Sequence, residues 1–202
     1  MQKPLPEDVA PQLSVVSIPV PPAPPEPRPT GAGHTHAGPV FAYILDGEIE
    51  NQVEPDPPAI YKPGDFFYEA PGHVHRFLRN LSTTEPAKLI VFQSGATGTP
   101  APAIKTLLQE PLLTAKNQEV SLFRLTLAPL SLSETPAHSN PDVIYVLEGT
   151  IETTSTPNQT TTYNPGGLFL DPANGASLTI KNASASEPAK LLLSESASKE
   201  SR

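Results

Sequence analysis

An internal repeat constrains the fold of this 202-residue chain more than any other feature. Residues 41–50, FAYILDGEIE, align with residues 143–152, VIYVLEGTIE, and the offset is 143 − 41 = 102 positions. Without a gap, the same offset places the EPAKL sequence of residues 85–89 on an identical EPAKL sequence at residues 187–191. A match of this length indicates duplication of one ancestral module. Each module has about 100 residues, which is an ordinary size for a domain.

The repeat predicts two domains, residues 1–103 and residues 104–202. The 27 prolines and 12 glycines argue against long helices. Strand signals dominate instead. Many segments alternate apolar and polar residues, are rich in β-branched residues and end at turn residues. Asp46-Gly47 is one such turn and is a strong hairpin signal. Short strands with regularly spaced turns favour a sandwich or a small barrel. Only residues 104–113 leave a choice, between a short helix and the first strand of the second domain. The strands of the first domain are expected at residues 13–20, 40–50, 64–69, 75–79 and 87–93.

Composition narrows the classes of partner. The net charge of −8 disfavours nucleic acids and anionic membranes, and no run of about 18 apolar residues is present to span a bilayer. Without cysteine, the chain has no disulfide, thiolate ligand or thiol nucleophile. The N-terminal residues lack the apolar core of a signal peptide, so we expect a soluble protein, in the cytoplasm if this N-terminus is native. The expected partner is a small-molecule substrate, and the expected state is a monomer or a homodimer.

Four of the five histidines, His34, His36, His73 and His75, lie in two short segments. Imidazole is the commonest ligand of transition metals. Residues i and i+2 of an extended strand point to the same face, so the H-x-H pair can direct two imidazoles into one site. His75, from a distant strand, can supply a third. His73 follows the Pro71-Gly72 turn, and we expect it at the rim rather than among the ligands.

These segments resemble the two sequence motifs of the cupin superfamily. Residues 34–48, HTHAGPVFAYILDGE, resemble the first motif, and residues 64–80, GDFFYEAPGHVHRFLRN, resemble the second. The resemblance covers both modules and implies an all-β bicupin, with two tandem jelly-roll barrels in one chain. It also implies that His34, His36 and His75 hold one divalent transition metal, Fe, Mn, Ni, Zn or Cu, inside the first barrel.

One expected ligand of the family is missing. Cupins often carry a glutamate four residues after the second histidine, and that position is Val40 here. Glu69 is the candidate replacement, because strand alternation places it on the same face as Phe67, and an interior carboxylate is costly unless it is paired or metal-bound. We expect Glu69 to act as a fourth ligand or as a general base. The alternative is a strand-end glutamate that pairs with Arg76 or Arg79 in solvent.

The second module lacks the same histidine set. The offset places Pro136, His138 and Ser177 at the three histidine positions. One imidazole cannot hold a transition metal alone, so we expect a degenerate, metal-free second barrel. A mixed site of His138 with Asp142 and Asp171 is the alternative.

Two classes of function follow from these residues. The first is a metal-dependent cupin enzyme that acts on a small organic substrate in the first barrel, either an oxidoreductase such as a dioxygenase or an isomerase or lyase. The second is a non-catalytic cupin that binds a small molecule or a metal, as a sensor or a storage module. A buried Glu69 at the metal site favours catalysis. Tyr43, Tyr68 and Arg76 are candidates for the substrate pocket.

Overall fold

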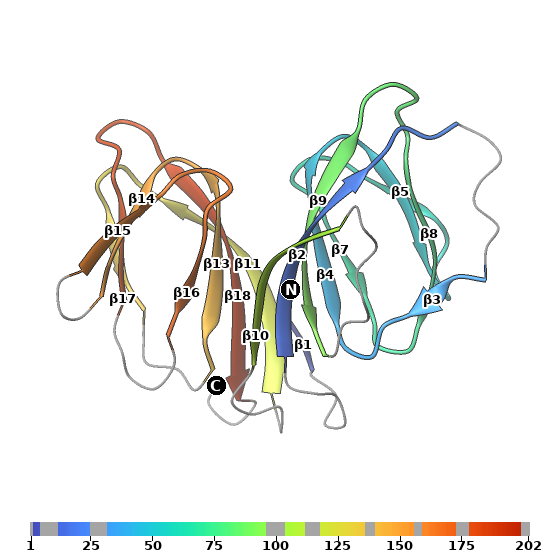
Figure 1. The fold of residues 1–202 in the computed structure, drawn as a ribbon, viewed down its shortest axis with the longest axis horizontal. Coiled ribbons are helices and arrows are strands. Elements are labelled where there is room, and N and C mark those ends of the chain that lie inside the picture. Colours follow the sequence, from blue (N-terminus) through green and yellow to red (C-terminus); the bar gives the residue numbers. More distant parts are fainter. Residues whose placement is uncertain are drawn as a thin grey trace. The chain divides into compact units, whose positions relative to one another are not determined.

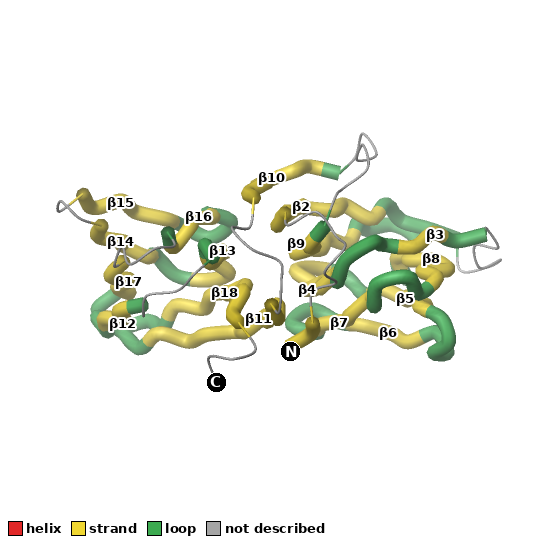
Figure 2. The backbone as a smooth tube through the Cα atoms, turned by 90° about the horizontal axis from the view of Figure 1, so that it is seen from below, coloured by secondary structure: helices red, strands yellow, loops and turns green. Residues whose placement is uncertain are grey.

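The computed structural model describes residues 2–4, 12–24, 32–95, 104–111, 118–135, 140–155, 159–172 and 178–198. The regular secondary structure of these residues consists of β-strands alone, and all strand pairings are antiparallel (Figure 1). Loops join the strands throughout the described backbone (Figure 2). Within it, no helix is long and apolar enough to cross a membrane.

The chain divides into two compact units, and each unit combines a five-stranded sheet with a four-stranded sheet. Residues 5–111 form one unit, here named the first barrel. Residues 1–4 and 112–202 form the other, named the second barrel. The predicted all-β fold with two jelly-roll barrels is therefore confirmed.

The first barrel contains the blue to green strands of Figure 1 except β1 (Gln2–Pro4), which belongs to the second barrel. The five-stranded sheet has the order β10-β2-β9-β4-β7, with bounds Lys105–Pro111, Gln12–Val20, Ala87–Ser94, Val40–Asp46 and Phe66–Glu69. The four-stranded sheet has the order β3-β8-β5-β6, with bounds His34–Thr35, Val74–Asn80, Ile49–Val53 and Ala59–Tyr61. Apolar side chains of both sheets, such as Ala42, Leu89 and Ile49, pack into one buried core. This core closes the barrel through burial of apolar surface.

The second barrel repeats this arrangement. Its five-stranded sheet has the order β1-β11-β18-β13-β16, with bounds Gln2–Pro4, Gln118–Leu127, Ala189–Ser198, Asp142–Glu148 and Leu168–Asp171. Its four-stranded sheet has the order β12-β17-β14-β15, with bounds Leu132–Glu134, Leu178–Asn182, Ile151–Ser155 and Gln159–Tyr163. Ile144, Ile151 and Leu191 belong to its core.

The duplication extends to strand register and to turn contacts. Val40 pairs with Glu69 in the first barrel, and the residues 102 positions later, Asp142 and Asp171, pair in the second. Gly47, in the β4–β5 turn, has a φ of 76°, a left-handed conformation that favours glycine. A Cβ added there would also lie 2.5 Å from the Cβ of Ala87. The equivalent Gly149 has a φ of 83° and the same relation to its alanine neighbour, at 2.8 Å.

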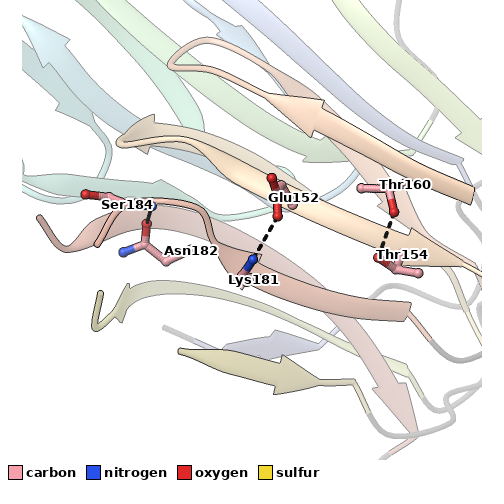
Figure 3. A network of polar contacts seen from close by, with 6 residues as sticks. All are labelled: Glu152, Thr154, Thr160, Lys181, Asn182 and Ser184. Carbon is pink, nitrogen blue, oxygen red and sulfur yellow. Dashed lines mark hydrogen bonds and ion pairs between the residues drawn. The ribbon is translucent and has the colours of Figure 1, made fainter. Parts of the chain in front are cut away.

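An asparagine repeated in both modules ties the end of a strand to its surroundings. The Asn182 amide donates hydrogen bonds to the carbonyl oxygens of Leu127 at 3.1 Å and Glu187 at 2.8 Å. Its Oδ1 accepts a bond from the backbone N–H of Ser184 at 3.0 Å (Figure 3). Asn80 makes the equivalent bonds in the first barrel. Asn182-Ala-Ser184 matches the glycosylation sequence, but this fully buried amide is committed to the fold.

An ion pair is also repeated, in two different environments. Arg79 Nε lies 2.6 Å from Glu50 Oε2, and both side chains are buried. In the second barrel, Lys181 Nζ lies 3.1 Å from Glu152 Oε2 (Figure 3). These two side chains are 39% and 35% exposed. The same pair of positions therefore holds a buried pair in one barrel and a solvated pair in the other.

Two strands, β10 and β1, belong to different domains from those expected with a boundary after residue 103. β10 pairs with β2, so it completes a sheet of the first barrel, with Glu110 opposite Leu13. The helix alternative for residues 104–113 is wrong over the described part, and the strand does not open the second domain. β1 pairs with β11 of the second barrel, with Gln2 opposite Ser121. Such pairing between segments distant in sequence leaves no local pattern that could predict it.

Candidate metal centre

The first barrel encloses a cavity of about 470 Å³, lined by side chains from both of its sheets. His34, His36, Glu69 and His75 all line this cavity. Its size is within the range of pockets that take small molecules, about 300–1,000 Å³. The four side chains therefore face one cavity that a small ligand could enter, with Glu69 and His75 buried, His36 half-buried and His34 exposed.

Strand pairing brings the three histidines of the two motifs together. His34 in β3 lies directly opposite His75 in β8, and His36 follows β3 immediately. The three rings offer nitrogen atoms that lie within 4.8 Å of one another. His34 Nε2 and His36 Nε2 are 3.1 Å apart. Metal–nitrogen bonds of about 2.1 Å at right angles would separate two ligand atoms by about 3 Å, so this spacing suits a bound ion.

A buried nitrogen of His75 supports the fit of a metal to these residues. Its Nε2 is buried and has no hydrogen-bond partner among the described residues. Leaving a buried polar atom unsatisfied costs about 1–3 kcal/mol. Coordination would satisfy this nitrogen, so the His34, His36 and His75 group could hold a divalent transition metal.

Glu69, at the end of β7, faces the histidines rather than solvent. The residue is 4% exposed. Its Oε2 lies 3.0 Å from His36 Nε2, and its Oε1 lies 3.3 Å from His75 Nδ1. The alternative that Glu69 pairs with an arginine in solvent does not agree with this geometry, because Arg76 and Arg79 contact other glutamates, each at 2.6 Å.

The electrostatic environment keeps His34 in the form that binds metals. Burial lowers the pKa of His34 below its ordinary value of 6.5, and the neighbouring His36 and His75 lower it further. Glu69 acts in the opposite direction and raises this pKa. The net lowering favours the neutral imidazole, which has a free lone pair for a metal.

Two tyrosines predicted for the substrate pocket are on the wrong face of the sheet. Ala42 lines the cavity, so its neighbour Tyr43 points to the other face, where its ring lies 4.9 Å from that of Phe66. Tyr68 lies beside Glu69 in sequence and also points away from the cavity, with its ring 5.3 Å from that of Phe41. Burial raises the pKa of Tyr68. The prediction that these tyrosines line the pocket is therefore wrong, because strand alternation directs both side chains to the other face of the sheet.

Arg76 is also not among the described residues that line the cavity. Its Nε donates a hydrogen bond to Glu54 at 2.6 Å, and its Nη1 donates one to the carbonyl oxygen of Ala32 at 3.0 Å. These contacts hold the guanidinium away from the cavity, so the prediction that Arg76 lines the substrate pocket is wrong. His73 is exposed in the turn before β8 and is not one of the described cavity residues either.

Sequence reasoning missed two residues at the cavity. Gln93 lines it and is half-buried, at the end of the alternating series that begins with Leu89 and Val91. This alternation was the signal that could have identified it. Gly38 approaches the backbone closely, because an added Cβ would lie 1.8 Å from the carbonyl oxygen of Ser94. Only a residue without a side chain fits there, two positions after His36.

The second barrel has a buried polar group at the equivalent level. Asp142 and Asp171 face each other across β13 and β16 and are 6% and 0% exposed. Pro136, His138 and Ser177, the positions equivalent to the three histidines, lie outside the described residues. Among the residues that the structure describes in both barrels, only the His34, His36 and His75 group forms a candidate metal cluster.

Comparisons with known proteins agree with this fold. Residues 25–93 match the family model described as Cupin domain. A search of curated proteins found no match. Among solved structures, the salicylate 1,2-dioxygenase from Pseudaminobacter salicylatoxidans is similar, with a TM-score of 0.61 and 14% identity, over 92% of this chain and 71% of that chain. An oxalate decarboxylase from Lactobacillus farciminis, in a formate complex, has a TM-score of 0.61 and 12% identity, over 93% and 79% of the two chains.

AerE from Microcystis aeruginosa is similar over 91% of this chain and 87% of that chain, with a TM-score of 0.58 and 15% identity. Identities this low show a shared fold and leave the activity open. The family match falls within the first barrel, and the fold likeness extends over most of both chains in each comparison. Together with the two-motif histidine cluster, the family match identifies residues 25–93 as a cupin domain within the first barrel.

Proposed function

We propose that this protein is a metal-dependent cupin enzyme that acts on a small organic substrate inside the first barrel. The observation that carries the proposal is the position of Glu69. Its carboxylate is buried in a cavity of about 470 Å³, 3.0 Å from His36 and 3.3 Å from His75. A carboxylate next to three imidazoles can offset the charge of a bound cation and can also accept a proton.

The residues divide into two roles. His34, His36 and His75 would hold one divalent transition metal, which supplies Lewis-acid or redox chemistry when bound. Glu69 would be either a fourth ligand or the base that takes a proton from the substrate. Both roles need the buried, inward orientation that Glu69 has. Glu69 and His75 are buried beside the apolar walls of the cavity, where low polarity strengthens electrostatic interactions, whereas His34 and His36 are open to solvent.

Within this proposal, the finer assignment is an oxidoreductase of the dioxygenase type. Three histidine ligands leave open positions on the ion for a substrate and for O₂. The fold likeness to a protein named salicylate 1,2-dioxygenase supports this assignment only as an analogy. Isomerase or lyase chemistry would use the same residues without oxygen.

Metal loading followed by oxygen uptake tests the proposal. Chelator-treated protein is incubated separately with Fe²⁺, Mn²⁺, Ni²⁺, Cu²⁺ and Zn²⁺, and bound metal is measured by elemental analysis. We expect about one ion per chain in the parent and a large loss in His34→Ala, His36→Ala and His75→Ala. Oxygen uptake is then screened with small chelating organic acids and phenols. Glu54→Gln, a charge-removing variant on a half-exposed residue away from the cavity, is the matched control.

The results separate the two classes of function. Glu69→Gln should keep the metal and lose turnover if Glu69 is a base, and it should bind metal more weakly if Glu69 is a ligand. A parent protein that binds no ion in stoichiometric amount contradicts the proposal. A parent that binds one ion and turns over no substrate, with or without O₂, favours a non-catalytic binding module instead.

A further inference from the structure

We infer that the substrate is a small, largely apolar molecule that binds the ion through oxygen and carries no more than one negative charge. Small dianions, such as oxalate, would be disfavoured. This inference rests on the proposed function and adds the class of substrate to it. It also separates the chain from what the name of a similar structure, oxalate decarboxylase, says of that protein.

The walls of the cavity are the first line of evidence. Apolar side chains from several strands line it, among them Val16, Ile18, Leu78, Leu89, Val91 and Ile104. Such walls favour apolar ligand surface, which gains free energy when it leaves water. Thr35, Gln93 and Ser94 also line the cavity and can donate hydrogen bonds, but these uncharged side chains cannot offset the charge of a second carboxylate. A ligand that places an apolar body against these walls and an oxygen group toward the histidines fits both ends of the site.

The charge balance at the histidines is the second line of evidence. Three neutral imidazoles, the Glu69 carboxylate and a divalent ion together carry a net charge of +1. A monoanionic ligand brings this sum to zero, whereas a dianion leaves a net negative charge inside an apolar cavity, which is unfavourable. No Lys or Arg is found among the described residues that line the cavity. The nearby guanidinium groups of Arg76 and Arg79 already contact Glu54 and Glu50.

Gln93 is the third line of evidence, because it places a neutral polar group on the cavity wall two strands away from Glu69. Glu69 pairs with Val40, and Val40 pairs with Gln93, so the three residues form one row across β7, β4 and β9. All three line the cavity. Two strand spacings separate Glu69 from Gln93, about 9–10 Å between backbones. An amide can donate to and accept from an uncharged polar group, so Gln93 is the residue that we assign to substrate specificity.

Ligand titrations of the cobalt-loaded protein test this inference. Tropolone, as its monoanion, offers two oxygens and an apolar ring, and oxalate offers two oxygens and two charges. Binding of each is followed through the visible spectrum of Co²⁺ in the full-length protein. The measured quantity is the ratio of the Kd for oxalate to the Kd for tropolone, divided by the same ratio for aqueous Co²⁺. We expect this corrected ratio to favour tropolone at least tenfold. Gln93→Lys adds a cation to the wall and should shift this ratio about tenfold toward oxalate, whereas the uncharged control Gln93→Leu should not shift it toward oxalate.

Each outcome decides one question. An equal or greater corrected preference for oxalate overturns the inference, and so does a Gln93→Lys variant with an unchanged ratio. A protein that holds Co²⁺ but shows no spectral change with either ligand also overturns it, while the metal site itself is retained. Failure to bind Co²⁺ at all contradicts the proposed function, and this inference fails with it.

Discussion

Replacing Glu69 with glutamine should reduce the thermal stabilisation that the metal gives to the protein. The substitution keeps the shape of the side chain and removes one negative charge, 3.0 Å from His36 Nε2 and 3.3 Å from His75 Nδ1. Groups that contact metal-binding histidines contribute about 10- to 100-fold to metal affinity. That loss equals about 1.4–2.7 kcal/mol. In excess metal, the stabilisation by the bound ion falls by the same amount.

This free energy converts into a measurable shift. One kcal/mol changes Tm by about 2–4 °C in a chain of this size, so the metal-induced rise in Tm should be about 3–11 °C smaller in Glu69→Gln than in the parent. The assay is calorimetry of chelator-treated protein, with and without excess Mn²⁺. Asp171→Asn, the equivalent change in the second barrel, is the matched control and should keep the parental rise. A Glu69→Gln variant with the parental metal-induced rise in Tm would refute the reasoning.

Three other predictions concern the histidines and the repeated ion pair. His73→Ala should leave bound metal unchanged in elemental analysis, whereas His75→Ala should remove most of it; the reverse result would make His73 the ligand. Metal affinity, measured as Kd between about pH 5 and pH 8, should fall on acidification, because protons compete for the rings. The pKa of His34 is lowered, so its own protonation begins to weaken binding only below its ordinary value of 6.5; tighter binding in acid would contradict this. Arg79→Met removes the cation from the buried pair with Glu50 and should cost about 3–5 kcal/mol in urea unfolding. The solvated equivalent, Lys181→Met, should cost less than about 1 kcal/mol; equal costs would show that burial does not decide the difference.

The sequence was most informative where a pattern was local or repeated. Alternation placed Glu69 on an inward face, and the H-x-H spacing predicted that His34 and His36 would lie together. Val40 stands where cupins often carry a glutamate, and the pairing of Val40 with Glu69 on the adjacent strand explains why one position can replace the other. Strand alternation also explains why Tyr43 does not line the pocket: Val40 and Ala42 face the cavity, so Tyr43 points to the opposite face of the sheet.

Other features depend on partners that no local pattern specifies. Arg76 could have faced the cavity, but it is held by Glu54, 22 positions earlier in the chain. The pairing of β10 with β2 joins residues more than 80 positions apart, such as Lys105 and Ser17 (105 − 17 = 88), and only the folded sheet reveals it. Long-range pairing of this kind is selected by packing of the whole barrel rather than by propensity.

The candidate ligands are divided between the two sheets of the first barrel. His34 and His75 belong to the four-stranded sheet, and Glu69 belongs to the five-stranded sheet. An ion that contacts both would act as a reversible cross-link between the sheets, much as a disulfide joins distant segments. Opening of the barrel would then require the ion to leave first, so the loaded protein should unfold more slowly than the metal-free protein.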